Sequence, residues 1–170
     1  MKQKCTIQTP LGEMIACAEQ DSLCGLHFVG QRYAPEDNGG WRNCPDNHLF
    51  PTLRGQLQAY FAGQLRVFDL PLDPRGTVFQ MAVWALLRTI PSGMTTTYGA
   101  LARQLGGQRD GKVPSAQAVG GAVGHNPIAI IIPCHRVIGA DGSLTGYAGG
   151  LERKSALLAL ENPQYQASQF

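Results

Sequence analysis

Two kinds of hydrophobic periodicity follow one another along the chain. Before about residue 76, short segments alternate apolar and polar positions, as strands with one buried face do. After it, apolar residues recur three and four positions apart, as they do in amphipathic helices. The pattern predicts a small α/β region followed by a mainly helical region.

The first region predicts an antiparallel sheet covered by one helix. Its short turns favour a meander, and residues 31–47 are polar and predict a loop. Leu49, Leu53 and Leu57 have helical spacing, which predicts a helix over residues 48–63. A helix packed on one face of a sheet buries a small hydrophobic core between them. Strands are expected at residues 4–9, 14–18, 23–29 and 67–70.

Proline and glycine separate the two regions. The segment before Gly76 is rich in both and has no periodicity, which is typical of a linker. We therefore expect an N-terminal α/β domain over residues 1–73, a linker over 74–76, a second domain over 77–162 and a tail over 163–170.

The second region predicts four helices. Thr77 and Gln80 have the spacing of a capping box, and Pro91 and Gly93 end the helix that follows. Two shorter helices across a glycine-containing turn indicate a helix-turn-helix, although a plain helical hairpin has the same pattern. These two are expected at residues 98–105 and 115–123, and the last helix at residues 151–161.

The third of these helices contains Gly120 and Gly121, which cost about 1 kcal/mol each relative to alanine. Some other interaction must compensate. A surface of glycine and alanine lets another backbone approach closely. That backbone is either a second helix or the sugar-phosphate chain of a nucleic acid.

A run of isoleucines leads to the candidate chemistry. Residues 130–132 predict a short buried strand that Pro133 ends, and Cys134 and His135 follow at once. A thiol beside a base is an activated nucleophile. A buried cysteine can equally act as a small hydrophobic residue.

Composition says less about function than the Cys-His motif does. The chain has no apolar run long enough to cross a membrane, no visible signal peptide, and five cysteines without disulfide-like spacing. We expect a reducing compartment, the cytoplasm. Residues 1–76 hold seven basic and eight acidic residues, and residues 77–170 hold seven and four. This basic excess permits DNA binding without demonstrating it.

The motif from Ile132 to Ile138 (IPCHRVI) resembles the active site of the O6-alkylguanine-DNA alkyltransferases. The resemblance extends in order over the second half of the chain and is specific as a set. Its other motifs begin at Thr77, Tyr98, Ala118, Asn126 and Gly146, and it ends at Glu161.

The resemblance implies a fold and a function. The N-terminal domain would be a non-catalytic ribonuclease H-like α/β fold, and the C-terminal domain a winged-helix-like, mainly α fold with a helix-turn-helix. The protein would be a monomer that repairs double-stranded DNA containing O6-alkylguanine, and also O4-alkylthymine. It would flip the base out, transfer the alkyl group irreversibly to Cys134 and need no cofactor. The competing classes are a cysteine hydrolase, a non-catalytic lesion-binding module and a plain transcription factor.

The resemblance also implies roles for single residues. Glu161 would orient His135, which would take the Cys134 proton through water, while Tyr98 assists the departing guanine. The pocket would be formed by Asn126, Val137, Tyr147, Ala148, Gly149 and Val123. DNA would be bound by Gln117, Ala118, Gly120, Gly121, Tyr98, Thr97, Arg109 and Lys112.

Two features depart from a simple match. Gln117 stands where the family usually has an arginine that enters the base stack, and Arg109 or Lys112 could substitute for it. Cys5, Cys17, Cys24 and His27 suggest zinc, but their spacing is not that of a zinc motif, so we predict no metal.

Overall fold

The computed structural model describes residues 1–108 and 110–165. The chain forms two compact units. One contains Met1–Arg75 together with Pro127–Ala129, and the other contains Gly76–Asn126 together with the chain from Ile130 onward.

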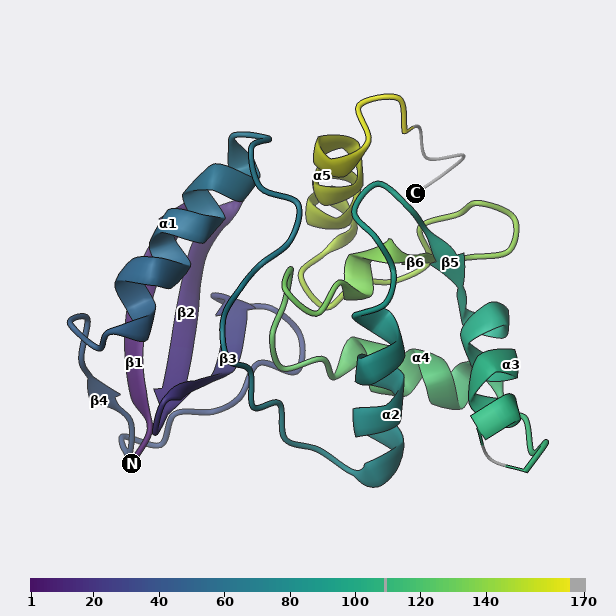
Figure 1. The fold of residues 1–170 in the computed structure, drawn as a ribbon, viewed down its shortest axis with the longest axis horizontal. Coiled ribbons are helices and arrows are strands. Elements are labelled where there is room, and N and C mark those ends of the chain that lie inside the picture. Colours follow the sequence, from purple (N-terminus) through teal and green to yellow (C-terminus); the bar gives the residue numbers. More distant parts are fainter. Residues whose placement is uncertain (109, 166–170) are drawn as a thin grey trace. The chain divides into compact units, whose positions relative to one another are not determined.

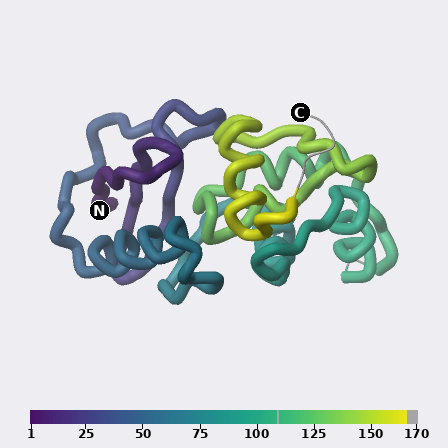
Figure 2. Tube along the Cα trace, turned by 90° about the horizontal axis from the view of Figure 1, so that it is seen from above, coloured from purple at the N-terminus to yellow at the C-terminus, as the bar shows by residue number. Residues whose placement is uncertain are grey.

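The N-terminal unit is a sheet with one covering helix (Figures 1 and 2). Strands β1 (Gln3–Thr9), β2 (Gly12–Glu19) and β3 (Ser22–Phe28) form the predicted antiparallel meander. Helix α1 (Leu49–Phe61) buries its apolar face, including Leu53 and Leu57, as its spacing predicts.

Two expectations for this unit were wrong. Within the predicted loop, β4 (Arg42–Asn43) pairs in parallel with β1, which gives the sheet order β3-β2-β1-β4. Residues 67–70 form no strand, and Val67 is 78% exposed. The pairing falls slightly later, where the Leu23 backbone bonds to Pro71 and Asp73. In both places, backbone hydrogen bonds to a strand distant in sequence determine which residues are extended.

The C-terminal unit begins with three helices, α2 (Val78–Leu87), α3 (Tyr98–Gln108) and α4 (Ala116–Gly124). The Thr77–Gln80 capping box is formed as predicted. Helix α3 continues beyond the predicted end at Leu105. The indole of Trp84 is buried and donates to the Ala122 carbonyl oxygen at 2.9 Å, which ties α2 to α4.

The predicted isoleucine strand is absent, and residues 130–132 form a turn and bend instead. The residues just before the run pair with β3 instead. Ala129 N–H donates to the Leu26 carbonyl oxygen, and Leu26 N–H donates to the Pro127 carbonyl oxygen. The chain then reverses, and Ile130 takes a φ of +72°, a left-handed conformation that β-branched residues rarely adopt.

After this turn the chain forms the candidate site. A 3₁₀ turn, Cys134–Arg136, leads into β6 (Val137–Ile138), which pairs in parallel with β5 (Thr96–Thr97). Helix α5 (Leu151–Glu161) is the last helix of the described chain and stops before Asn162, as predicted.

Candidate active site

Cys134 lies at the first position of the 3₁₀ turn and is 6% exposed. Burial raises the pKa of its thiol, because a thiolate is poorly solvated in an apolar environment. A hydrogen bond from Asn126 and the charge of Lys154 oppose that rise. The amide nitrogen of Asn126 also donates to the Ile132 carbonyl oxygen at 2.7 Å, which fixes the amide beside the thiol.

His135 and Glu161 form the predicted contact. His135 is fully buried, and its Nε2 lies 2.8 Å from Oε2 of Glu161, at the last turn of α5. Burial lowers the pKa of His135, an effect that the Glu161 carboxylate opposes and that Arg136 and Lys154 reinforce. We therefore take His135 to be neutral at physiological pH.

Arg136 is the second partner of Glu161. Its guanidinium donates to Oε1 at 2.8 Å and to Oε2 at 2.9 Å, and a third donor reaches the Ile90 carbonyl oxygen at 2.5 Å. Burial alone would raise the pKa of Glu161. The hydrogen bonds from His135 and Arg136 outweigh it and hold that pKa well below its usual range. Glu161 is therefore a carboxylate that accepts from both residues.

This arrangement fixes which imidazole nitrogen can act as a base. Because the Glu161 carboxylate can only accept, Nε2 of His135 carries the proton. The other nitrogen, Nδ1, then has a free lone pair, and it is buried without a protein hydrogen-bond partner among the described residues. Nδ1 is the basic atom of the site.

Lys154 is a site residue that the sequence interpretation missed. It is fully buried on α5, and its Nζ donates to the carbonyl oxygens of Leu144 at 2.5 Å and Gly146 at 2.9 Å. Burial lowers its pKa to about 8, and the nearby Cys134 opposes this shift. Lys154 thus joins α5 to the loop that precedes Tyr147 and carries positive charge close to the thiol.

Tyr98 and the loop before α5 contribute the remaining polar groups. The Tyr98 hydroxyl lies 3.1 Å from the Thr145 hydroxyl, and burial raises the pKa of Tyr98. The Tyr147 hydroxyl is buried with no hydrogen-bond partner among the described residues. The other predicted pocket residues Val123, Val137 and Gly149 are buried, and Ala148 is half-buried.

Four of the eight predicted DNA-binding residues lie on α4. Gln117, Ala118 and Gly121 are exposed, whereas Val119 and Ala122 face the core. The ring of Tyr98 lies near Gly120, at 3.8 Å from where a Cβ would stand. Thr97 accepts a hydrogen bond from Ala100 N–H, and Lys112 is exposed. Arg109 lies outside the described residues.

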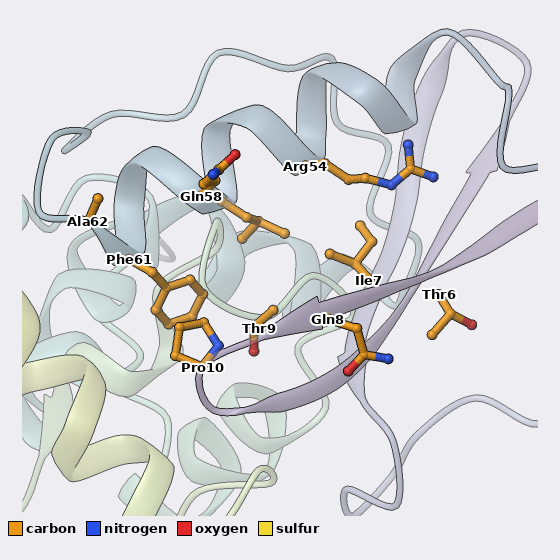
Figure 3. A pocket seen from close by; sticks show the side chains of 10 residues that line it. Thr6, Ile7, Gln8, Thr9, Pro10, Arg54, Gln58, Phe61 and Ala62 are labelled. Atoms are coloured by element: carbon orange, nitrogen blue, oxygen red, sulfur yellow. The ribbon is translucent and has the colours of Figure 1, made fainter.

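The N-terminal unit contains a cavity that holds none of this chemistry. A cavity of about 660 Å³ lies between β1 and α1 (Figure 3), and its lining includes Arg54 but no cysteine, histidine or carboxylate. Within residues 1–108 and 110–165, no three His, Cys, Asp or Glu side chains are placed to hold a metal ion. The same residues contain no helix that is both long and apolar enough to cross a membrane.

Comparison with protein families assigns both halves of the chain. Residues 4–74 match the family described as 6-O-methylguanine DNA methyltransferase, ribonuclease-like domain. Residues 78–163 match the corresponding DNA binding domain. The predicted fold class is confirmed.

Individual relatives agree over nearly the whole chain. A methylated-DNA–protein-cysteine methyltransferase of Mycolicibacterium paratuberculosis is 48% identical over 96% of this chain and 94% of its own length. One of Methanosarcina acetivorans is 43% identical over 91% of this chain and 94% of its own.

Solved structures give the same assignment. The O6-methylguanine methyltransferase of Mycobacterium tuberculosis superposes with a TM-score of 0.84 at 47% identity, covering 99% of this chain and 97% of that one. A structure of the OGT protein from the same organism in complex with DNA gives 0.82 at 46% identity, covering 98% and 95%. The chain belongs to the methylated-DNA–protein-cysteine methyltransferase family.

Proposed function

We propose that this DNA-repair methyltransferase moves the alkyl group from O6-alkylguanine in duplex DNA irreversibly to the Sγ atom of Cys134, once per protein molecule. The observation that carries the proposal is the buried basic atom of His135, which is next to the thiol in sequence. Glu161 fixes the tautomer of His135, and Arg136 in turn binds Glu161. A buried nucleophile with an oriented base suits covalent chemistry.

The first step is deprotonation of Cys134. Side chains of neighbouring residues do not face one another easily, so a water molecule between Cys134 and Nδ1 of His135 would carry the proton. His135 becomes an imidazolium ion, which Glu161 stabilises through the hydrogen bond from Nε2. The thiolate is stabilised by the Asn126 amide and the Lys154 charge. Arg136 keeps the carboxylate ionised throughout.

The second step is displacement at the alkyl carbon. The thiolate forms a carbon–sulfur bond while the bond between that carbon and O6 breaks, and guanine leaves with the electron pair. Tyr98 would donate a proton or a hydrogen bond to the base as it leaves. The product is a thioether, which water does not cleave, so the protein is consumed. The lesion supplies the alkyl group, and the reaction needs no cofactor.

The reacting base must leave the duplex to reach a buried thiol, at a cost of a few kcal/mol. The exposed small residues of α4 suit the narrow minor groove, about 6 Å wide. Gln117 on the same face can fill the space that the base vacates, without the charge that an arginine would bring. The M. tuberculosis OGT structure with DNA supports DNA as the partner.

We extend the proposal to O4-alkylthymine, which presents an alkylated oxygen in a similar position, and to a monomer acting in a reducing compartment such as the cytoplasm. The five cysteines are free, which suits that compartment. Light scattering of the protein alone and on a short duplex measures the number of chains per particle.

Intact-protein mass spectrometry after mixing with a duplex that contains O6-methylguanine tests the transfer. We expect a gain of one methyl group that peptide mapping assigns to Cys134, and none in Cys134→Ser. A Cys44→Ser variant is the matched control and should react normally. A protein that released the methyl group and turned over would be a hydrolase. Binding without any gain would indicate a lesion-binding module.

A further inference from the structure

Two cysteines of the N-terminal sheet lie in contact, although the proposed reaction uses neither. Cys17 on β2 is 1% exposed and Cys24 on β3 is half-buried. Their Sγ atoms are 3.3 Å apart, and Sγ of Cys24 is 3.5 Å from the Cys17 carbonyl oxygen. The contact therefore joins two adjacent strands.

An irregularity in the strand pairing produces this contact. Ala18 pairs with Leu23 and Cys17 pairs with Gly25, so Cys24 is an extra residue on β3. Such a bulge turns the side chain of the extra residue away from strict alternation. A Cβ at Gly25 would stand 3.2 Å from Cys17 Cβ, so the absence of a side chain there leaves space for the thiol.

The two thiols differ in their ionisation. The hydrogen bond with Cys17 lowers the pKa of Cys24 to about 7, and Lys2 and Arg75 contribute in the same direction. The same contact, together with burial, raises the pKa of Cys17. These shifts favour the thiolate, the form that reacts with oxidants, at Cys24 and the thiol at Cys17. Burial raises the pKa of both Cys5 and Cys134.

We propose that Cys17 and Cys24 are a redox modification site that a hydroperoxide converts reversibly to an intramolecular disulfide. The half-buried Cys24 thiolate attacks the peroxide, forming a sulfur–oxygen bond while the oxygen–oxygen bond breaks. Hydroxide leaves if the oxidant is hydrogen peroxide, and alkoxide leaves if it is an organic hydroperoxide. The Cys17 thiol then attacks the sulfenic acid, a sulfur–sulfur bond forms, and water leaves with the Cys17 proton. The two thiols lose two electrons in total and the peroxide gains them.

The required movement is small. The sulfur atoms must approach from 3.3 Å to about 2.05 Å, which side-chain rotation at a half-buried bulge can provide. The disulfide would link β2 to β3 within the N-terminal unit, whereas the proposed alkyl acceptor Cys134 belongs to the other unit. Oxidation at this site would therefore leave the acceptor reduced. In a reducing compartment such a disulfide is transient.

Peptide mapping of the full-length protein after limited hydrogen peroxide and alkylation of the remaining thiols tests the proposal. Cleavage at Glu19 or Asp21 places Cys17 and Cys24 on separate peptides, so a link between them is seen directly. We expect one linked pair that lacks two hydrogen atoms, disappears on treatment with dithiothreitol and leaves methyl transfer unchanged.

Three variants make the test specific. Cys24→Ser should abolish the link, and Cys44→Ser, the control, should retain it. Cys17→Ser should leave a Cys24 sulfenic acid that dimedone traps, because the second thiol is gone. Oxidation that appears first at Cys44 or Cys134, or peroxide treatment that leaves Cys17 and Cys24 unlinked, would overturn the proposal.

Discussion

At the scale of single residues, one carboxylate organises the proposed site. Glu161 accepts hydrogen bonds from both His135 and Arg136, and its side chain is 2% exposed. It lies at the C-terminal end of α5, where the helix dipole disfavours negative charge. The two buried donors offset that effect and keep Glu161 ionised.

This arrangement predicts a pH dependence of stability. The folded protein holds the pKa of Glu161 below the ordinary value of 4.5. The ionised carboxylate therefore stabilises the folded state fully above pH 4.5, and this stabilisation is lost as the pH falls from 4.5 toward the lower pKa of the folded protein. Glu161→Gln leaves Arg136 without its charge partner and should lower the free energy of unfolding at pH 7 by about 3–5 kcal/mol.

Urea unfolding at a series of pH values measures this effect. The difference between the original protein and Glu161→Gln should shrink below pH 4.5, while the exposed control Glu152→Gln stays close to the original protein. A difference that stayed constant with pH would contradict the assignment.

Lys154 gives a second prediction at this scale. Lys154→Met keeps the length of the side chain but leaves the Leu144 and Gly146 carbonyls without their donor, which should lower the free energy of unfolding by about 1–3 kcal/mol. The positive charge of Lys154 stabilises the Cys134 thiolate. Its loss should slow methyl transfer about tenfold for each 1.4 kcal/mol by which the thiolate is destabilised.

Single-turnover rates on O6-methylguanine duplex measure the kinetic effect, and Ser155→Ala on the same helix is the control. An unchanged rate in Lys154→Met would mean that the lysine only supports the fold.

The sequence interpretation found only part of this site. Local rules and the family resemblance pointed to Cys134, His135 and Glu161. They assigned no role in the site to Arg136 or Lys154. A signal for Lys154 did exist, because it shares one face of α5 with Leu157, Leu158 and Glu161 at helical spacing. A lysine on a buried face needs partners, and spacing alone cannot name loop carbonyls as those partners.

At the scale of elements, α4 gives a test that separates folding from DNA binding. A Cβ at Gly121 would meet nothing within 4 Å, so Gly121→Ala should stabilise the protein by up to about 1 kcal/mol through helix propensity. If α4 lies in the minor groove, the added methyl group should weaken binding to duplex DNA.

Gly107→Ala on α3 is the matched control, because a Cβ there also meets nothing within 4 Å. It should stabilise the protein to a similar extent without affecting affinity. Thermal unfolding and fluorescence anisotropy give the two quantities. Equal DNA affinity of both variants would contradict the placement of α4 in the groove.

Elements were predictable where local rules decide them. The capping box at Thr77 and the end of α5 depend on neighbouring residues, and both were correct. The isoleucine run satisfies every local rule for a strand but forms a turn, because residues 127–129 already pair with β3. The short strands β4, β5 and β6 depend on partners distant in sequence, which periodicity does not reveal.

At the scale of the whole molecule, charge separates the proposed DNA-binding part from the rest. The net charge is only +2, and the basic excess lies in residues 77–170. Lys112→Ala should weaken binding to all duplexes and reduce the slope of log affinity against log salt by about one, because one phosphate contact is lost. Arg66→Ala, an exposed arginine of the N-terminal unit, should leave the slope unchanged.

In the proposed reaction, Cys134 accepts one alkyl group irreversibly. Titration of a fixed amount of protein with an excess of O6-methylguanine duplex measures it most directly. Methyl transfer should stop at one group per protein molecule, all of it as a thioether on Cys134, and fresh lesion should not restart the reaction. Continued loss of lesions beyond that ratio, or a methyl group on another residue, would contradict the account.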